Sequence, residues 1–459
     1  MKMNRSFRIG WLIALLACAP GARAQAPQPL TLRQAVELAL KQNPALRATR
    51  EQVNVSRAQV GEARAGWLPR LDVSQGFTRG DNPVYVFGTL LTQRQFKAGN
   101  FNLSALNQPS PLDNFQTRVD GQVSLFDSGR TYWREAGAKK MSTAADYETA
   151  QARQDLILRV VRAYYGVIVA REELGAANQA LDSAKANEQQ VKAMTTSGLV
   201  VTSDLLSAEV FRSQMRDRQI TASNALEVAR LNLGRELGMP PGASPQVAGT
   251  LGQPKSLAGK IDQWEKTALS ERPALRAAQL QEQAANTGRK LAKADFGPQI
   301  GLFADFERDA ETLGGPSGTN WAAGARLDWN VFDGGAKRSR LAEADARRSQ
   351  AEDQLEWLRS GIELEVRQAY LDAQAAAERA GAAQAAVSQA GESLRIIQNR
   401  YQAGLVTITE LLRAQTAQLD ARTGYLSALH DWQVARAQLE RAAGQLTLGS
   451  NFFDQGGTP

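Results

Sequence analysis

The amino-acid sequence predicts a mixed α+β membrane protein, with a duplicated chain, four transmembrane β-strands and very long helices outside the membrane. Three observations predict this class. Several phrases occur twice at a constant separation, apolar stripes continue through two unusually long helical segments, and four short segments alternate between apolar and polar side chains. Alternation with a period of two is typical of strands, whereas apolar residues at spacings of three and four are typical of helices.

The duplication is visible in repeated phrases. LFDSG around Phe126 returns as VFDGG around Phe332, 206 positions later. PALRA occurs at Pro44 and again at Pro273, and these prolines are 229 positions apart. The two separations differ by 23, so the first copy carries 23 additional residues between positions 69 and 126. Repetition over such distances indicates two copies of one structural unit rather than unrelated domains.

Each copy has the same expected order: a helix that begins at the proline, a strand hairpin, a very long helix and a further helix. The first helix is expected to end near Gly66 or Asp295, because proline suits the first turn of a helix and the periodic pattern stops there. The predicted organisation is a signal peptide (1–24), a first repeat (25–238), a linker (239–260), a second repeat (261–444) and a C-terminal tail (445–459).

The N-terminus has the pattern of a secretory signal. Basic residues precede an apolar run at 9–17, and Ala22-Arg23-Ala24 offers a cleavage site after Ala24. The alternative is lipidation of Cys18, because Leu15 to Cys18 resembles a lipoprotein cleavage box. In both cases the chain is exported.

Removal of residues 1–24 leaves 50 basic and 47 acidic residues, a net charge of +3, so the sequence gives no support for nucleic-acid binding. Cys18 is the only cysteine, which leaves the mature chain without disulfides or thiolate metal ligands. We expect no metal site and no cofactor. The only histidine, His430, lies within a predicted helix and is interpreted as a packing or surface residue rather than a catalytic base, so we expect no enzyme activity.

The long helices carry apolar stripes that predict coiled-coil-like packing, and their many alanines predict closely spaced neighbours. The segment from Gly334 to Tyr401 would span roughly 100 Å as a helix. The second stripe comprises Leu355, Leu358, Ile362, Val366, Ala369, Ala373, Ala376, Ala380, Ala383, Val387, Ala390, Leu394, Ile397 and Tyr401; the first follows the same positions from Leu156 to Val191, with Glu188 as a polar exception.

The four predicted strands are long enough to cross an outer membrane when tilted. Four strands cannot close a membrane barrel and open edges are not tolerated in lipid, so other copies of the chain must complete it. Trp67, Trp321 and Trp329 are expected near the membrane interfaces. The apolar faces are Leu71, Val73 and Phe77; Phe115, Val119, Val123 and Leu125; Ile300, Leu302 and Phe306; and Trp321, Ala323, Ala325, Leu327, Trp329 and Val331. The polar faces, expected to line a wet lumen, carry Asp72, Arg118, Asp120, Asp305, Glu307, Arg326 and Asp328.

The additional residues of the first copy fall within residues 81–115, between its two strands. This segment is rich in Asn, Gly, Pro and aromatic residues. A disordered insertion is one interpretation, but the aromatic residues favour packing. We therefore expect a structured cap near the channel mouth.

The chain resembles the TolC family of outer-membrane efflux channels over essentially all of its mature length. The resemblance is carried by LTLRQAVELALKQNPAL, VSLFDSG, VRQAYLDAQAA and RYQAGLVTITELLRAQ. It implies a homotrimer with a twelve-stranded barrel and a periplasmic α-helical tunnel. It also implies docking to a periplasmic adaptor and an inner-membrane transporter, and passive conduction of cargo to the exterior. The alternative is a periplasmic coiled-coil adaptor or structural protein, but such adaptors usually carry a single helical hairpin.

The resemblance gives roles to two sets of residues. The strand-to-helix corners, one in each half, are Phe126, Asp127 and Gly129, and Phe332, Asp333 and Gly335. The expected adaptor contacts are the helix turns Gly198-Leu199-Val200 and Gly404-Leu405-Val406, because apolar residues at an exposed turn indicate a partner surface. Simple capping of the helix ends by glycine is the structural alternative.

A gate is expected beside these turns. Asp204 and Glu410 each follow the turn glycine by six positions. The structural alternative is that these acids only stabilise the N-terminus of the helix that follows, a role that requires no gate. Three copies of Glu410 around a pore would form an anionic ring that favours cations. The resemblance implies a constriction here, tethered through Asp204 by Tyr401 and an arginine. This chain departs from that pattern: Val406 replaces the tethering arginine, and Arg413 replaces a second constriction acid. A Tyr401–Asp204 link is the expected remaining latch.

Overall fold

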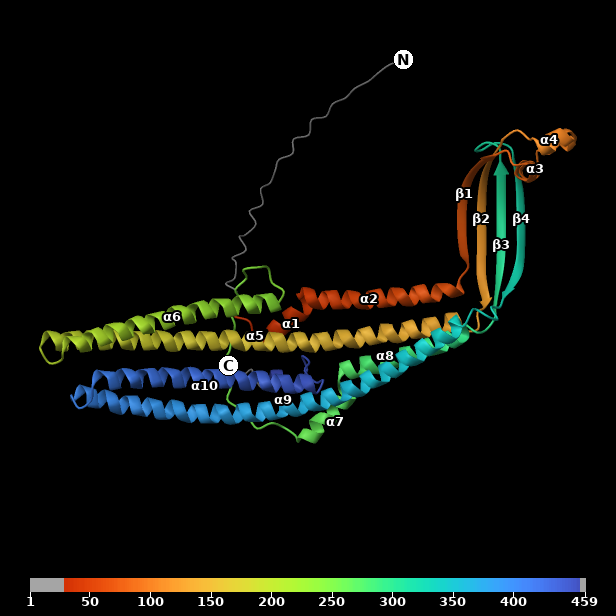
Figure 1. Cartoon of the computed structure of the whole chain (residues 1–459). Coiled ribbons are helices and arrows are strands. Elements are labelled where there is room, and N and C mark those ends of the chain that lie inside the picture. The colour runs from red at the N-terminus through yellow and green to blue at the C-terminus, as the bar shows by residue number, and fades with distance from the viewer. Residues whose placement is uncertain (1–28, 455–459) are drawn as a thin grey trace, which may run out of the picture.

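The computed structural model describes residues 29–454. The predicted signal peptide, Cys18 and residues 455–459 lie outside the described residues. The chain is elongated: a small sheet stands at one end, and two helical hairpins extend from it toward the other end (Figure 1).

The sheet is antiparallel and its strand order follows the sequence. β1 (Arg70–Gly80) pairs with β2 (Leu112–Phe126), β2 pairs with β3 (Gln299–Ala310), and β3 pairs with β4 (Ser317–Asp328). Both repeats therefore contribute one hairpin to a single sheet, in which β1 and β4 each keep one free edge. β4 begins and ends earlier than expected, so Trp329 and Val331 lie beyond its end instead of continuing its apolar face.

The two faces of the sheet differ in chemistry. One face exposes large apolar side chains, among them Leu71, Val73 and Trp321. The opposite face carries ion pairs within and between strands: Arg118 pairs with Asp120 at 2.7 Å and with Glu307 at 2.8 Å. Because a charge facing lipid is costly, the polar face is suited to an aqueous lumen and the apolar face to the membrane.

The helices repeat as the sequence predicts. The two long helices have the same length, 67 residues, and each turns back into a helix of 35 residues. The α5–α6 and α9–α10 hairpins lie side by side, with α10 packed against α5 (Figure 1). The principal helices are α2 (Pro44–Arg64), α5 (Arg130–Thr196) and α6 (Thr202–Glu236) in the first repeat, and α8 (Pro273–Ala294), α9 (Ala336–Gln402) and α10 (Ile408–Ala442) in the second.

Two short helices were not predicted. α1 (Leu32–Gln42) and α7 (Ile261–Glu271) each precede the proline that begins the next helix. α1 begins with a capping box, in which the Thr31 hydroxyl accepts from the Gln34 N–H and the Gln34 side chain accepts from the Thr31 N–H. This motif was visible in the sequence and could have located the helix start. Other short elements are the 3-10 helices η1 (Ala65–Trp67) and η2 (Ala98–Phe101), and α11 (Asn451–Asp454).

The apolar stripes form much of the helical core. On α5 the stripe members Leu156, Val160 and Val191 are buried. The polar exception, Glu188, pairs with Arg212 of α6 at 3.3 Å, so the hairpin accommodates its charge. On α9 the stripe is buried from Ile362 to Ala380, half-buried from Ala383 to Ile397, and buried again at Tyr401. Within one protomer, the distal part of α9 is therefore incompletely covered.

A close joint recurs where each repeat folds back on itself. Gly238 follows α6 with a φ of 74°, and a Cβ there would lie 2.8 Å from the carbonyl oxygen of Gln42. Gly444 follows α10 with a φ of 78°, and a Cβ there would lie 2.8 Å from the Cα of Arg272. Asn43 Nδ2 donates to the Glu236 carbonyl at 2.9 Å, and Arg272 Nη1 donates to the equivalent carbonyl, that of Ala442, at 3.2 Å. Different side chains thus make the same contact in the two repeats.

The additional residues of the first repeat form helices. α3 (Pro83–Thr92), η2 and α4 (Leu103–Asn107) lie at the far end of the strands from the long helices (Figure 1). Phe96 packs edge-on against both Phe87 and Phe101, with ring centroids 5.0 and 5.2 Å apart. These aromatic contacts give the segment a small core of its own.

Candidate functional sites: the hairpin tips and the strand-to-helix corners

The two hairpin tips have equivalent backbone geometry. Gly198 (φ 71°) and Gly404 (φ 72°) adopt the left-handed conformation that ends each long helix. The N–H of Leu199 donates to the Met194 carbonyl, and the N–H of Leu405 donates to the Arg400 carbonyl, each at 2.9 Å. These bonds satisfy the last carbonyls of the helices, so glycine is required for the reversal itself.

The side chains of the tips divide into exposed and packed residues. Leu199 is 72% exposed and Leu405 is 67% exposed. Val200 and Val406, by contrast, are half-buried against a cluster that includes Tyr401 and joins the two tips. Both valines therefore contribute to the packing between the tips, and Leu199 and Leu405 are the more exposed part of the expected adaptor surface.

One exposed residue at the tips was not predicted from the sequence. Val201 is 63% exposed and occupies the N-cap position of α6 without a side-chain hydrogen bond. The equivalent residue of the second repeat, Thr407, caps α10 by accepting from the Glu410 N–H. The sequence did contain a signal for this exposure: Val201 is apolar, whereas the equivalent residue of the second repeat is a threonine that can cap a helix.

The structure places the predicted gate residues around the same tips. Glu410 and Arg413 are exposed in the first turns of α10, and Asp204 is half-buried at the start of α6. Burial, and secondarily the charge of Asp204, raise the pKa of Tyr401. However, the buried Tyr401 hydroxyl has no hydrogen-bond partner among the described residues. The expected Tyr401–Asp204 latch is thus not formed within one protomer.

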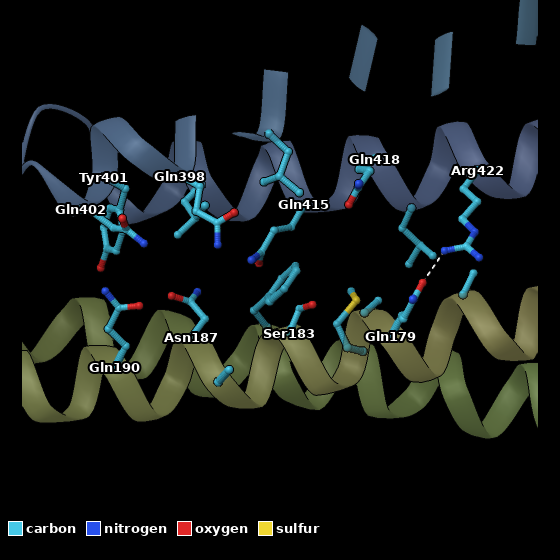
Figure 2. A pocket seen from close by; sticks show the side chains of 18 residues that line it. Gln179, Ser183, Asn187, Gln190, Gln398, Tyr401, Gln402, Gln415, Gln418 and Arg422 are labelled. Atoms are coloured by element: carbon cyan, nitrogen blue, oxygen red, sulfur yellow. Dashed lines mark hydrogen bonds between the residues drawn. The ribbon is translucent and has the colours of Figure 1, made fainter. Parts of the chain in front are cut away.

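A polar cavity separates the two hairpins just behind the tips. Its volume is about 460 Å³. Figure 2 shows side chains of α5 facing those of α9 and α10 across it, with Tyr401 and Gln190 near one end. Arg422 donates to Gln179 at the other end. Six of the lining residues are glutamines, at positions 179, 190, 398, 402, 415 and 418.

The chemistry of this cavity indicates hydration. Asn187 Nδ2, Gln415 Oε1 and the Tyr401 hydroxyl are buried without partners among the described residues. Amides and hydroxyls both donate and accept, and the cavity is much larger than the ~30 Å³ that one water occupies. These unpaired groups and this volume are suited to bound water.

The corners connect each hairpin of strands to a long helix. Gly129 (φ 84°) and Gly335 (φ 91°) precede α5 and α9. Asp127 Oδ2 accepts from the Thr131 N–H at 2.7 Å. Asp333 accepts equivalently from the Lys337 N–H at 3.0 Å. Each aspartate therefore caps the first turn of its helix, where a negative charge is favourable.

The phenylalanines of the corners have a different position. Phe126 and Phe332 are exposed at the end of the sheet, beside the aspartates that cap the helices. An exposed aromatic ring at the end of a membrane strand is suited to the membrane interface. The repeated Phe-Asp-x-Gly phrase thus combines an exposed ring, a helix cap and a backbone bend.

The pKa of Asp333 reflects its environment. Desolvation raises this pKa, but the Lys337 N–H, the Lys337 charge and Arg340 together outweigh desolvation and lower it below the usual aspartate value. A carboxylate with a depressed pKa stabilises the fold above its ordinary pKa, and this contribution is lost as the pH falls through the folded-state pKa. The cap is therefore intact at neutral pH.

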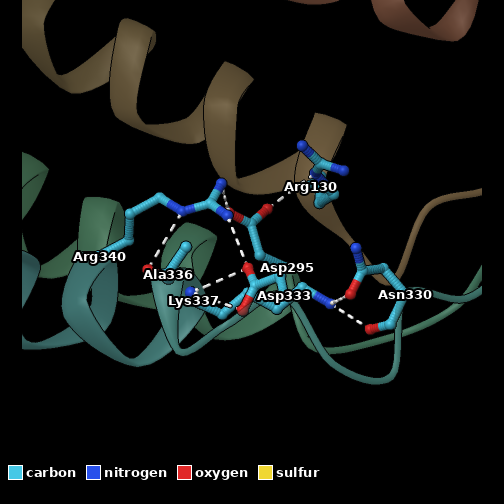
Figure 3. A network of polar contacts seen from close by, with 7 residues as sticks. All are labelled: Arg130, Asp295, Asn330, Asp333, Ala336, Lys337 and Arg340. Carbon is cyan, nitrogen blue, oxygen red and sulfur yellow. Dashed lines mark hydrogen bonds and ion pairs between the residues drawn. The ribbon is translucent and has the colours of Figure 1, made fainter.

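Asp295, at the end of α8, links the long helices of both repeats (Figure 3). It pairs with Arg130 of α5 at 3.0 Å and with Arg340 of α9 at 3.5 Å. Arg340 also reaches Asp333 at 3.1 Å. The equivalent position in the first repeat is Gly66, so one carboxylate serves both corners.

We expect Asp295→Ala to lower the midpoint of thermal unfolding by a few degrees. It removes the acceptor of two arginines, and we expect a cost of about 1–2 kcal/mol because the arginines are partly solvent-screened. Circular dichroism of the purified protein in detergent would measure the midpoint. Asp353→Ala is the matched control, because Asp353 is exposed on α9 and has no ion pair in the described structure. Equal midpoints for the two variants would show that the link contributes nothing.

Two further features are absent from residues 29–454. No helix in this part of the chain is long and apolar enough to cross a membrane. Nor do three or more potential metal-ligating side chains gather within it. His430 lies on α10, half-buried beside Asp431 at 3.3 Å.

Comparison with known proteins decides the family. The family model described as outer membrane efflux protein matches residues 35–239 and 264–445. The chain belongs to this family. Its relatives include protein CyaE of Bordetella pertussis, 28% identical over 426 residues that cover 91% of this chain and 84% of that protein. They also include outer membrane protein TolC of Escherichia coli, 23% identical over 440 residues that cover 91% and 83%.

Solved structures agree in fold. The Campylobacter jejuni CmeC outer membrane channel has a TM-score of 0.77 at 18% identity, covering 92% of this chain and 88% of that chain. A structure of CusC has a TM-score of 0.75 at 20% identity, covering 91% and 93%. At these identities the likeness shows the fold alone.

Membership of the outer membrane efflux protein family confirms the main predictions. The chain is an outer-membrane channel of the efflux and secretion class and extends into the periplasm. Its fold is that of the TolC-like channels, mostly helical with a small antiparallel sheet. The adaptor alternative is not supported. The family is one of transport proteins.

Proposed function

We propose that three copies of this chain close a twelve-stranded barrel in outer-membrane lipid and continue as a helical tunnel into the periplasm. The observation that carries this proposal is the four-stranded sheet, with free edges at β1 and β4 and exposed apolar side chains on one face. Pairing β4 of one copy with β1 of the next removes every edge, as the hydrocarbon region requires.

The helices support the same assembly. Trp357, Leu364 and Leu371 of α9 are exposed and spaced seven residues apart. A heptad-spaced apolar row is typical of a helix that packs against another helix. No helix within residues 29–454 of the same protomer covers these side chains, so the neighbouring copy is the proposed partner.

We expect Leu364→Glu combined with Leu371→Glu to prevent trimer formation while the protomer keeps its helical content. Two carboxylates in each of three equivalent interfaces would have to be desolvated. Native mass spectrometry in detergent, with circular dichroism, would test this. The wild-type protein should give trimers and the variant mostly monomers. If the variant still gives trimers, this face of α9 does not form part of the interface between protomers.

The channel is proposed to act with a periplasmic adaptor at the hairpin tips and with an inner-membrane transporter. The exposed Leu199 and Leu405 support the adaptor contact. Relatives include an alkaline protease secretion protein and a fusaric acid resistance protein. The names of related proteins thus refer both to protein secretion and to resistance. Co-purification after cross-linking in cells would identify the adaptor and the transporter, and through them the cargo.

We also propose that Glu410 lies at the periplasmic constriction. Glu410→Gln should lower the preference for cations, because it removes three negative charges from a pore ring. Tyr401→Phe should leave the open probability unchanged, since the Tyr401 hydroxyl has no hydrogen-bond partner among residues 29–454 of the protomer. Single-channel recordings in planar bilayers would measure both. An unchanged cation preference would place the constriction elsewhere.

A further inference from the structure

The additional segment of the first repeat, residues 81–111, is firmly attached to the sheet; we call it the cap. Its principal anchor is Gln93, which directly follows α3 and is 2% exposed. The Gln93 amide donates to the Asp113 carbonyl at 2.8 Å and to Asn114 Oδ1 at 2.9 Å. A buried amide bonded to strand β2 fixes the end of α3 against the sheet.

The anchor continues across the sheet through a buried carboxylate. Asp309 of β3 is 1% exposed. It accepts from Asn114 Nδ2 at 2.7 Å and Gln116 Nε2 at 3.2 Å on one side, and from Asn320 Nδ2 at 3.5 Å on the other. Charge-assisted bonds from both neighbouring strands make this a specific polar contact, although most of the sheet is exposed.

The cap also touches β4, the strand at the far edge of the sheet. A Cβ at Gly318 would lie 1.8 Å from the Thr92 carbonyl oxygen, so only glycine permits this approach. Arg94 donates to the Thr319 carbonyl at 3.1 Å and holds a φ of 58°, which a residue with a side chain rarely adopts. The cap therefore crosses from β1 and β2 over β3 to β4.

The face on which the cap lies is set by the strand register. Asp309 is directly opposite Gln116 on β2 and Gly318 on β4, and Glu307 is opposite Arg118 and Asn320. Alternation along each strand puts these residues on the polar face, together with the ion pairs of Arg118. The exposed leucines and valines lie on the opposite face. The cap thus covers the lumenal face at the outer end of the strands.

We propose that the cap forms a second constriction, at the outer opening of the channel. This proposal rests on the trimeric barrel proposed above, in which three caps enter one lumen. Val84, Leu91, Phe101 and Leu103 are exposed on the cap. These side chains make the rim of the narrowed opening apolar, and an apolar constriction resists the passage of water and ions. The proposed channel then has two constrictions: the charged Glu410 ring at the periplasmic tips, and the apolar side chains of the caps at the outer opening.

A thiol inside the barrel tests the constriction independently of the periplasmic gate. Gln122 is exposed on the polar face and pairs with Arg70, at the inner end of the strands. Because Cys18 is the only cysteine of the sequence, Gln122→Cys gives a single reporter in the mature chain. A bulky polyethylene-glycol maleimide added to intact cells can reach this thiol only through the outer opening. A small maleimide serves as the control for thiol reactivity.

Two variants remove the cap from the lumen in different ways. Gly318→Val forces Thr92 away from β4, and replacement of residues 83–110 by a short glycine–serine linker deletes the cap. Thr319→Val is the matched control, because its side chain lies on the opposite face and the carbonyl that accepts from Arg94 is kept. The bulky reagent should label the reporter roughly tenfold faster in both cap variants than in the wild type or the control. The small reagent should label all four at similar rates.

Equal, rapid labelling by the bulky reagent with and without the cap, in proteins that remain trimeric, would overturn the constriction and leave the channel proposal standing. Monomers only, by native mass spectrometry of the wild-type protein, would overturn the barrel and the constriction with it. If only the deletion variant accumulates in the membrane, its labelling rate alone decides.

Discussion

Replacing Leu199 and Leu405 together with aspartate is expected to abolish export while trimers still form. Both side chains are mostly exposed, so the protomer loses little packing. A docked adaptor would bury them, and a fully buried leucine contributes about 1.5–3 kcal/mol. Three protomers with two tips each multiply this loss, and the introduced carboxylates would also need to be desolvated. The measurements are the amount of adaptor that co-purifies after cross-linking in cells and the export activity of the same cells.

The conservative pair Leu199→Met and Leu405→Met is the matched control. Methionine keeps the apolar surface and adds no charge, so adaptor recovery should stay near the wild-type level. Trimer formation by native mass spectrometry should be the same for all variants. Full adaptor recovery with the aspartate variant would show that the tips do not form the docking surface.

The second large effect is expected at the joints. Gly238→Ala and Gly444→Ala should each lower the stability of the protein by about 2–4 kcal/mol. A left-handed residue with a Cβ costs roughly 1 kcal/mol or more. The new Cβ would also meet backbone atoms at 2.8 Å, and relief of such overpacking typically costs about 1–3 kcal/mol. Urea unfolding followed by circular dichroism would report this as a lower midpoint.

The hairpin tips provide matched controls for this effect. Gly198 and Gly404 have nearly the same φ as Gly238 and Gly444, but a Cβ there would have no neighbour within 4 Å. Gly198→Ala and Gly404→Ala therefore carry the conformational cost alone, about 1 kcal/mol. The difference between the two pairs isolates the close approach at the joints. Equal losses at tips and joints would mean that the joints relax without cost.

Much of this fold was predictable because the two repeats share short sequence motifs and local periodic patterns. The Phe126 and Phe332 phrases located both corners, and the glycines Gly198 and Gly404 located both tips. Helix periodicity and strand alternation depend on near neighbours in the chain, so a single sequence contains them. The family resemblance then supplied the assembly that a single protomer does not contain.

What the sequence did not reveal depends on contacts between distant residues. Val200 was expected to be at a docking surface, but it packs into the cluster that joins the tips. Tyr401 was expected to bond Asp204, but its hydroxyl reaches no partner in the protomer. The anchor of the cap unites Gln93, Asn114 and Asp309, from three separate parts of the chain. No local pattern encodes the register that brings such residues together.

The polar cavity between the hairpins has a mechanical consequence. Near the middle of the molecule the hairpins adhere through a large apolar core, and pulling them apart there would expose that core to water. Behind the tips they face each other across the cavity with its six glutamines, and two smaller apolar clusters, around Phe211 and Tyr401, join them there. Parting two hydrated amide surfaces exchanges one set of hydrogen bonds for another at little net cost. Separating the hairpins therefore exposes less apolar surface at the periplasmic end than near the middle of the molecule, so the periplasmic end is the more compliant part of the protomer.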